Sequence, residues 1–396
     1  MTWYAAGLGD GVFVHDLRLP IRMKSPAASL PGTHPRRRAP AFHVLAWAIL
    51  AFLAVPASAQ SAYTVTEIGV LPGHTHGYAI SINDAGQVAG YSEPTIPNMT
   101  QRGWIYKAGA LSALGTLPKR GQHSTATFIH PTTGVIVGDG DTGDFRPQGM
   151  VRIGANLHNV FPNNGGNTHL LRVDTAGRIY GYFIGGKSTD WMGGVWTPNP
   201  KKAGTYTQEI LGGPGMPLSF NAHGQGVGYQ NGGTLRQLAA FWDNAGTRPM
   251  QVLPSRPEFT SSSANAISDN GTTIVGTGHP AFSSLPLLWS RAGTTWTLRD
   301  LPVLTGDNQG SANGVNNAGV VIGTSTYGIP GTWQIEASTS VVWLQGVPRE
   351  IQSLLDPVTG AGWLITGLVS VNNSGQIAAN ALKGGFSRAI ILTPVP

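Results

Sequence analysis

The sequence contains no cysteine and few charged residues. Its 396 residues include no Cys, and Asp, Glu, Lys and Arg together make up 11%, against roughly 25% in an average domain. The absence of Cys excludes disulfide bonds, thiolate metal sites and cysteine nucleophiles. Three common enzyme motifs are also absent, because the chain has no Gly-x-Ser-x-Gly, no His-Glu-x-x-His and no P-loop. These absences remove the best-known hydrolase and nucleotide-binding classes.

The composition that remains is typical of short strands and tight turns. The chain has 55 Gly and 28 Pro. No segment after residue 60 shows the apolar period of an amphipathic helix. We therefore expect an all-β fold.

The first 59 residues have the features of an export signal. Arg36, Arg37 and Arg38 precede an apolar run over residues 41–55, and Ala57-Ser58-Ala59 follows as a small-x-small cleavage pattern. The run has about 15 residues, short of the ~20 that a membrane-spanning helix needs. This order predicts a secretory signal peptide cleaved near Ala59, no transmembrane segment in the mature chain, and a secreted or periplasmic location.

The chain is thus divided into three parts. Residues 1–22 precede the signal, and Met23 offers an alternative start, so we interpret 1–22 as a mis-annotated leader, 23–59 as the signal peptide and 60–396 as one domain. Residues 1–59 hold six Lys or Arg and two Asp, which leaves 19 basic and 17 acidic residues. The remaining net charge of +2 is too small to indicate the clustered basic surface that nucleic-acid binding needs. We expect no nucleic-acid partner and a monomer.

A short phrase recurs along the rest of the chain. It reads apolar, Asx, Asx, small, Gly, x, apolar, x, Gly, as in Ile82–Gly90. The copy around Ile129–Gly138 is degenerate, the copy from Ile267 closes one residue late at Gly276, and the last copy ends with Ala379 in place of Gly. The first Gly of each copy stands at positions 86, 134, 177, 224, 271, 319 and 375. Such a period indicates a repeat architecture.

A second marker has nearly the same period. A large apolar residue follows each phrase, and these markers are Trp104, Met150, Trp196, Trp242, Trp289, Trp343 and Ile390. We predict that the marker tryptophans end the third strand of each unit and lie in the core. The sixth unit is longer because of an insertion around residues 324–340.

Each unit is interpreted as four strands, a to d. Strand a precedes the Asx phrase, which forms a tight turn with Gly at positive φ and with Asp84 and Asp269 as turn formers. Strand b carries the second Gly, which allows close approach between packed sheets. Strand c ends on the marker, and strand d follows it, as at residues 114–117. Four strands per unit predict a seven-bladed β-propeller.

The two ends of the repeat array are complementary. An odd strand at Tyr63–Leu71 precedes the first unit, and the last unit ends at Leu392 without a strand d. We therefore expect the N-terminal strand to complete the last blade and to close the ring, which leaves no sheet half-built. An open array or two separate sandwiches are the competing interpretations.

The repeated phrase resembles that of the bacterial HAF-type extracellular repeat family. The similarity covers residues 63–394 and includes Ala240-Phe241-Trp242 and the closing Ile390-Ile391-Leu392-Thr393-Pro394. The resemblance implies an exported repeat protein, and it implies no established reaction and no catalytic residues. The second unit departs most from the pattern.

Longer connections, between strands d and a and between b and c, are expected on one face. They carry His74, His76, His123, His169 and His279, and also Lys187, Asp190, Trp191, Tyr327, Trp333 and Trp363. Loops on a rigid scaffold commonly carry function, although long loops collect polar residues for other reasons too. Since aromatic faces stack on sugars and neutral His bonds hydroxyls, the candidate binding residues are His76, His123, His169, Trp191 and Trp333.

The same face carries two candidate groups of metal ligands. The spacing of the His residues fits no compact metal motif, so no metal is assigned to them. Asp139, Asp141 and Asp144 form an acidic loop that resembles a calcium site but lacks the full EF-hand spacing. Calcium there is one interpretation, and a plain acidic loop is the other.

The sequence leaves two functions open. The first is a non-catalytic exported binding or scaffold protein for glycan or envelope material. The alternative is an exported polysaccharide hydrolase or lyase that uses the same face, which needs carboxylates placed across the bond. Asp139, Asp190 and Asp307 lie in suitable loops, but the sequence does not pair them.

Overall fold

The computed structural model describes most of the chain after residue 61. The described ranges are 62–95, 100–118, 121–143, 146–160, 167–184, 191–232, 236–243 and 250–395. The predicted leader and signal peptide lie outside them. Within these ranges, 28 strands and one 3-10 turn, η1 (Ile351–Leu354), make up the regular structure, which confirms the all-β class.

Four sheets contain four strands each, in chain order. Their strands are β2 (His76–Ile82), β3 (Val88–Glu93), β4 (Arg102–Lys107) and β5 (Ala110–Ala113); β6 (Ser124–Ile129), β7 (Ile136–Gly140), β8 (Gln148–Ile153) and β9 (Asn156–Asn159); β18 (Ser261–Ile267), β19 (Thr273–His279), β20 (Leu285–Ala292) and β21 (Thr295–Asp300); and β22 (Gln309–Val315), β23 (Val321–Gly328), β24 (Ile335–Leu344) and β25 (Val347–Glu350).

A larger sheet contains eight strands. They are β10 (Thr168–Val173), β11 (Ile179–Ile184), β12 (Trp191–Pro198), β13 (Tyr206–Ile210), β14 (Gly215–Phe220), β15 (Gly226–Gly232), β16 (Arg236–Trp242) and β17 (Gln251–Val252). Its two four-stranded halves, β10–β13 and β14–β17, are joined by a single parallel pairing between Met192 and Gly215.

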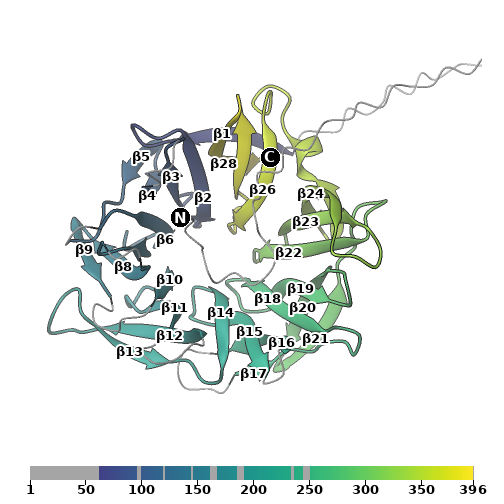
Figure 1. The fold of residues 1–396 in the computed structure, drawn as a ribbon, viewed down its shortest axis with the longest axis horizontal. Helices are drawn as coiled ribbons and strands as arrows, with labels where there is room; N and C mark the ends of the chain where they lie inside the picture. Colours follow the sequence, from purple (N-terminus) through teal and green to yellow (C-terminus); the bar gives the residue numbers. More distant parts are fainter. Residues whose placement is uncertain are drawn as a thin grey trace, which may run out of the picture. The chain divides into compact units, whose positions relative to one another are not determined.

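The last sheet combines the two ends of the described chain. Its order is β1 (Tyr63–Gly69), β28 (Phe386–Pro394), β27 (Ile377–Lys383) and β26 (Leu364–Val371). β1 runs antiparallel to β28, from Tyr63 opposite Pro394 to Gly69 opposite Ala389. The sheets are arranged around a central axis, and β1 lies beside β28 at the meeting of the first and last units (Figure 1).

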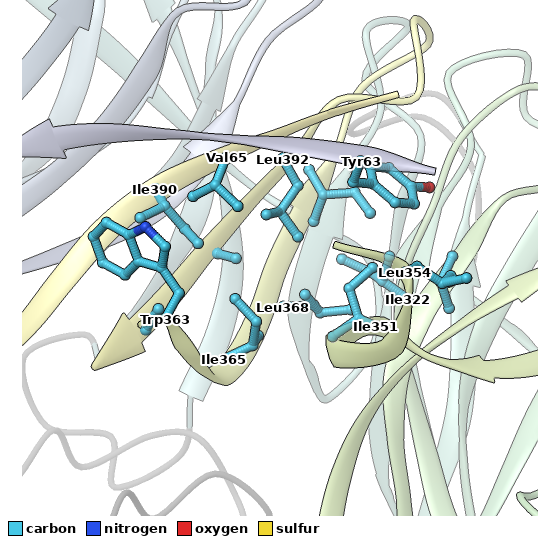
Figure 2. Packing of buried hydrophobic residues seen from close by; sticks show 14 residues of the cluster. Tyr63, Val65, Ile322, Ile351, Leu354, Trp363, Ile365, Leu368, Ile390 and Leu392 are labelled. Carbon is cyan, nitrogen blue, oxygen red and sulfur yellow. The ribbon is translucent and has the colours of Figure 1, made fainter. Parts of the chain in front are cut away.

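The core lies between neighbouring sheets. In the cluster of Figure 2, Tyr63 and Val65 of β1 pack over Leu392 and Ile390 of β28, and η1 packs against the same cluster. Ile322 and Val342 of the neighbouring sheet complete it. The predicted core role of the marker tryptophans is confirmed, because Trp104, Trp196, Trp242, Trp289 and Trp343 are all almost fully buried.

Glycine is required at the two repeated positions for different structural reasons. The first Gly of all seven copies has positive φ, from 68° at Gly134 to 79° at Gly375, as the tight turn requires. The second Gly faces a β-bulge in strand a: a Cβ on Gly138 would stand 2.0 Å from the carbonyl oxygen of Thr125. The close approach that we predicted between sheets therefore occurs within one sheet.

Two details of the strand prediction are wrong. Residues 114–117 form no strand, because strand d ends at Ala113, although Leu114 and Leu117 are buried. Strand c continues past the marker in most units; β4, for example, runs three residues beyond Trp104. The insertion of the sixth unit lengthens the β23–β24 hairpin. No helix in the described part of the chain is long and apolar enough to cross a membrane.

Candidate functional site

Each sheet has two ends that differ in their connections. At the turn end, tight turns such as the one at Asn83–Gln87 join the first and second strands. At the loop end lie the longer connections, such as those between β1 and β2 and between β3 and β4. The sequence-predicted binding residues belong to the loop end.

Two of these residues, His169 and Trp191, meet in a loop-end cluster with Asp139 and Tyr182. The His169 ring stacks on Tyr182 at 4.9 Å and lies 5.5 Å from the Trp191 ring. Its Nδ1 lies 2.9 Å from Oδ2 of Asp139. Burial, and then the charge on Asp139, raise the pKa of Tyr182, so its hydroxyl stays protonated.

The Asp139 carboxylate fixes the orientation of the His169 ring. One oxygen faces Nδ1, and the other accepts the backbone N–H of Leu170 at 3.1 Å. In a neutral His169 the proton then sits on Nδ1 and Nε2 is an acceptor. Nε2 bonds no residue among those described, so this nitrogen is free to meet a ligand.

The other three predicted residues lie in different surroundings. Nδ1 of His76 accepts the backbone N–H of Ser387 at 3.2 Å, and its ring lies against Phe386. The backbone N–H of His123 donates to Asp141, and burial lowers the pKa of the His123 ring. Trp333 is 65% exposed and contacts Phe282.

Other loop residues behave differently from the expectation. Trp363 is buried in the core, with Nζ of Lys383 over its ring at 4.4 Å, so its placement on the ligand face is wrong. Tyr327 is partly exposed. Lys187 and Asp190 lie outside the described residues.

The predicted acidic loop begins in strand β7, which contains Asp139, and its described carboxylates have different partners. Asp141 is fully buried and accepts backbone N–H bonds from Gln122, His123 and Gly143, whereas Asp139 faces His169. Asp144 lies outside the described residues, and the described ones contain no group of three potential metal ligands. Calcium at Asp139, Asp141 and Asp144 stays a prediction.

The turn end contains hydrogen bonds that sequence reasoning missed. The first Asn of a turn accepts two backbone N–H bonds with Oδ1, as Asn372 does from Ser374 and Gln376. Its Nδ2 reaches the next turn and donates to a backbone carbonyl. The bonds are Asn83 to Ile129, Asn221 to Ser268, Asn316 to Asn372 and Asn372 to Asn83.

The third unit uses another donor for the same purpose. Asp174 stands at its Asn position, and its carboxylate side chain has no N–H to donate. Arg172, two residues earlier, donates from Nη1 to the carbonyl of Phe220 at 3.2 Å. The guanidinium therefore replaces the missing amide.

The second Asx residues form a further set of links. Asp84 accepts both the backbone N–H and Nδ2 of Asn373 at 2.8 Å. Asp269 accepts bonds from Ala222, Arg172 and Asn373. Both carboxylates bond neighbouring turns, so their interpretation as local turn formers is incomplete.

We expect the substitution Asn372→Asp to lower the free energy of unfolding by about 1–3 kcal/mol. The change keeps the Oδ1 acceptor of the turn but removes the Nδ2 bonds to Asn83 and Gln376. Urea unfolding followed by tryptophan fluorescence measures the loss.

Asn270→Asp is the matched control for this prediction. Nδ2 of the exposed Asn270 donates no hydrogen bond to another described residue, so we expect a change within about 0.5 kcal/mol. Equal losses in the two variants would show that the inter-turn amide bonds contribute nothing.

We also expect stability to fall as the pH falls, in part because of His130. This residue occupies the Asn position of the second unit, and its Nδ1 accepts the backbone N–H of Thr133. Burial, and then the charge of Arg172, lower its pKa from 6.5, against an opposing effect of Asp174. Below pH 6.5 the unfolded chain binds a proton that the folded chain does not, so stability present above that pH is lost as it falls.

Urea midpoints between about pH 7.5 and 5.5 measure this slope. The variant His130→Asn removes the titrating group and supplies the usual turn residue, so its slope should be smaller than that of the parent. His123 leaves some slope, because its pKa is also lowered. If the urea midpoint of His130→Asn falls with pH as steeply as that of the parent, His130 does not contribute to the pH dependence.

A central cavity of about 380 Å³ lies at the turn end. Seven strands, β2, β6, β10, β14, β18, β22 and β26, contribute residues to its wall, together with turn residues such as Asp84 and Asn373. The five predicted binding residues are not among those that line it. The repeated phrase could have indicated this cavity. The last residues of strand a in each unit and the turns that follow them form the cavity wall.

Solved structures with similar folds are β-propellers or contain them. The β-propeller domain of the Trilobed protease from Pyrococcus furiosus, described as having an open velcro topology, matches with a TM-score of 0.51 and 11% identity over 80% of this chain and 95% of that one. A puromycin-hydrolyzing peptidase from Mycobacterium tuberculosis matches with a TM-score of 0.53 and 10% identity over 85% of this chain and 54% of that one.

An acylaminoacyl peptidase matches with a TM-score of 0.51 and 12% identity over 80% of this chain. The chain spans about half the length of the two peptidases. No protein-family model matches the chain, and no curated protein sequence matches it significantly. The sheets around a central cavity and the similarity to these structures show that the chain is a β-propeller. Sequence identities of 10–12% show the shared fold and do not indicate a shared activity.

Proposed function

We propose that this chain is a seven-bladed propeller, closed into a ring by β1, that binds glycan or envelope material without changing it chemically. The seven strands that line one cavity support the number of blades. The pairing of β1 with β28 and the bond from Asn372 to Asn83 support closure, because both join the first and last units. The ring gives the loop end a rigid support.

The observation that carries the binding role is the loop-end cluster. Trp191, which is half-buried, offers aromatic surface and packs edge-on against the buried Tyr182, and Asp139 holds His169 so that Nε2 can accept a hydrogen bond from a ligand hydroxyl. Sugar recognition combines these elements, since pockets pair aromatic walls with a few oriented polar groups. Trp333, which is widely exposed beside Phe282, is a separate contact point on a different hairpin.

The cellular setting of this proposal comes from the N-terminal sequence. We propose that the chain is exported after cleavage near Ala59, as a monomer without a nucleic-acid partner. The HAF-type repeat resemblance supports an extracellular or periplasmic role.

Binding to an array of immobilised bacterial polysaccharides tests the proposal. We expect Trp191→Ala to weaken binding at least about tenfold, which corresponds to 1.4 kcal/mol, because it removes aromatic surface from the cluster. Val347→Ala, a change at an exposed residue that begins β25 at the opposite end, is the control. Parent-like binding by Trp191→Ala, or a loss confined to Val347→Ala, would place the site elsewhere.

The alternative function, polysaccharide cleavage, is favoured by one contact. A carboxylate on Nδ1 and a free Nε2 are the arrangement of a histidine general base, and Asp139 and His169 have it. An assay for new reducing or unsaturated ends discriminates between the two. Product that disappears in His169→Gln while binding persists would establish catalysis and overturn the binding-only role.

A further inference from the structure

The central cavity contains an asymmetry that the repeats do not explain. At the position two residues before the first Asx, six of the seven units have Ser81, Phe128, Ser219, Ala266, Gly314 and Ser370. The third unit alone has a charged side chain there, Arg172, which lines the cavity. A single cation in a ring of mostly small side chains marks one side of an otherwise repetitive cavity.

The guanidinium of Arg172 is held on three sides. Nη1 donates to the carbonyl of Phe220 and Nη2 to Asp269 at 3.0 Å, while the ring of Phe128 lies 4.8 Å below. The side chain remains 22% exposed. An arginine has five N–H donors, so these bonds fix its plane and leave donors on the terminal nitrogens. A fixed guanidinium fork suits a carboxylate.

The rest of the cavity favours hydroxyl groups. The hydroxyls of Ser219 and Ser370 bond no other described residue, and Asn313 contributes an amide. Asp84, exposed at the turn end, adds carboxylate oxygens that accept hydrogen bonds from hydroxyls. A simple anion would meet repulsion from Asp84 and Asp269 with no hydroxyl groups to offset it. The charge of Arg172 is paired with Asp269, but a neutral sugar would offer the remaining N–H donors of Arg172 only uncharged acceptors.

We propose that the central cavity binds a sugar acid of monosaccharide size. Its carboxylate would pair with Arg172, and its hydroxyls would bond the serines, Asn313 and Asp84. The volume of about 380 Å³ lies within the range of small-molecule sites, roughly 300–1,000 Å³. The site is at the opposite end from the loop-end cluster and does not depend on the function proposed for that cluster.

Isothermal titration of the mature protein with D-glucuronate, D-glucose and acetate tests the proposal. We expect saturable binding of glucuronate with a Kd of about 1 mM or below, and at least about tenfold weaker binding of glucose and acetate. Arg172→Gln should lose glucuronate to the same degree, whereas Trp191→Ala should keep it. That last result separates this site from the loop end.

A second variant tests the cavity without removing the hydrogen bonds of Arg172. If Arg172→Gln fails to fold, Ser370→Leu, which fills the cavity without touching the guanidinium contacts, should still abolish binding. The proposal is overturned if glucuronate does not bind the parent, if acetate binds equally well, or if a folded Arg172→Gln or Ser370→Leu binds glucuronate like the parent.

Discussion

Replacing Trp242 by alanine is expected to lower the free energy of unfolding by about 3–5 kcal/mol. The side chain is 2% exposed and packs with Tyr180, Phe220 and Val195. Its Nε1 donates to the carbonyl of Gly212 at 2.9 Å. The substitution removes both the packing and the hydrogen bond, and denaturant melts measure the loss.

Trp333→Ala is the matched control for this prediction. The same atoms are removed there, but the side chain is widely exposed at the loop end, so we expect a change within about 0.5 kcal/mol. A loss below about 1 kcal/mol in Trp242→Ala would refute the core role, since core deletions of this size cost several times more.

Deleting Tyr63–Gly69 is expected to abolish cooperative folding. The segment is strand β1, which pairs with β28 along its length and buries Tyr63, Val65 and Ile68. Without it, β28 becomes an exposed edge and two core clusters lose part of their wall. Circular dichroism melts and size-exclusion chromatography follow the change.

Two point substitutions in β1 test whether the buried side chains of this strand stabilise the fold. Val65 is buried and the next residue, Thr66, is exposed. Val65→Asp should therefore destabilise strongly, because it buries a charge, whereas Thr66→Asp should melt close to the parent. If the truncated chain melts like the parent, β1 does not close the ring.

Much of the fold followed from local sequence. The positive φ of the first Gly and the Asx acceptors at Asn83 or Asn372 are properties of a few consecutive residues, and a turn needs nothing more. The repeat period then placed the strands, and buried Trp104 and Trp289 confirmed the second marker. The strand d prediction at residues 114–117 failed because buried apolar residues there belong to a connection.

The site could be predicted only in part. The sequence suggested that His169 and Trp191 share one end of the molecule. They belong to d–a and b–c connections, and alternating strand directions place both kinds of connection at the same end. It did not show that Asp139, 30 residues away, holds the His169 ring. It also grouped Trp363 with the loop residues, although packing places that ring in the core.

What the sequence determined by itself is the repeated unit: strand, Asx turn, strand and marker, all set by neighbours along the chain. The tertiary structure decided how the units meet. The amide of Asn372 reaches Asn83 across 289 residues, and Arg172 reaches Asp269 across 97. Such contacts depend on the positions of whole sheets, which no local pattern specifies.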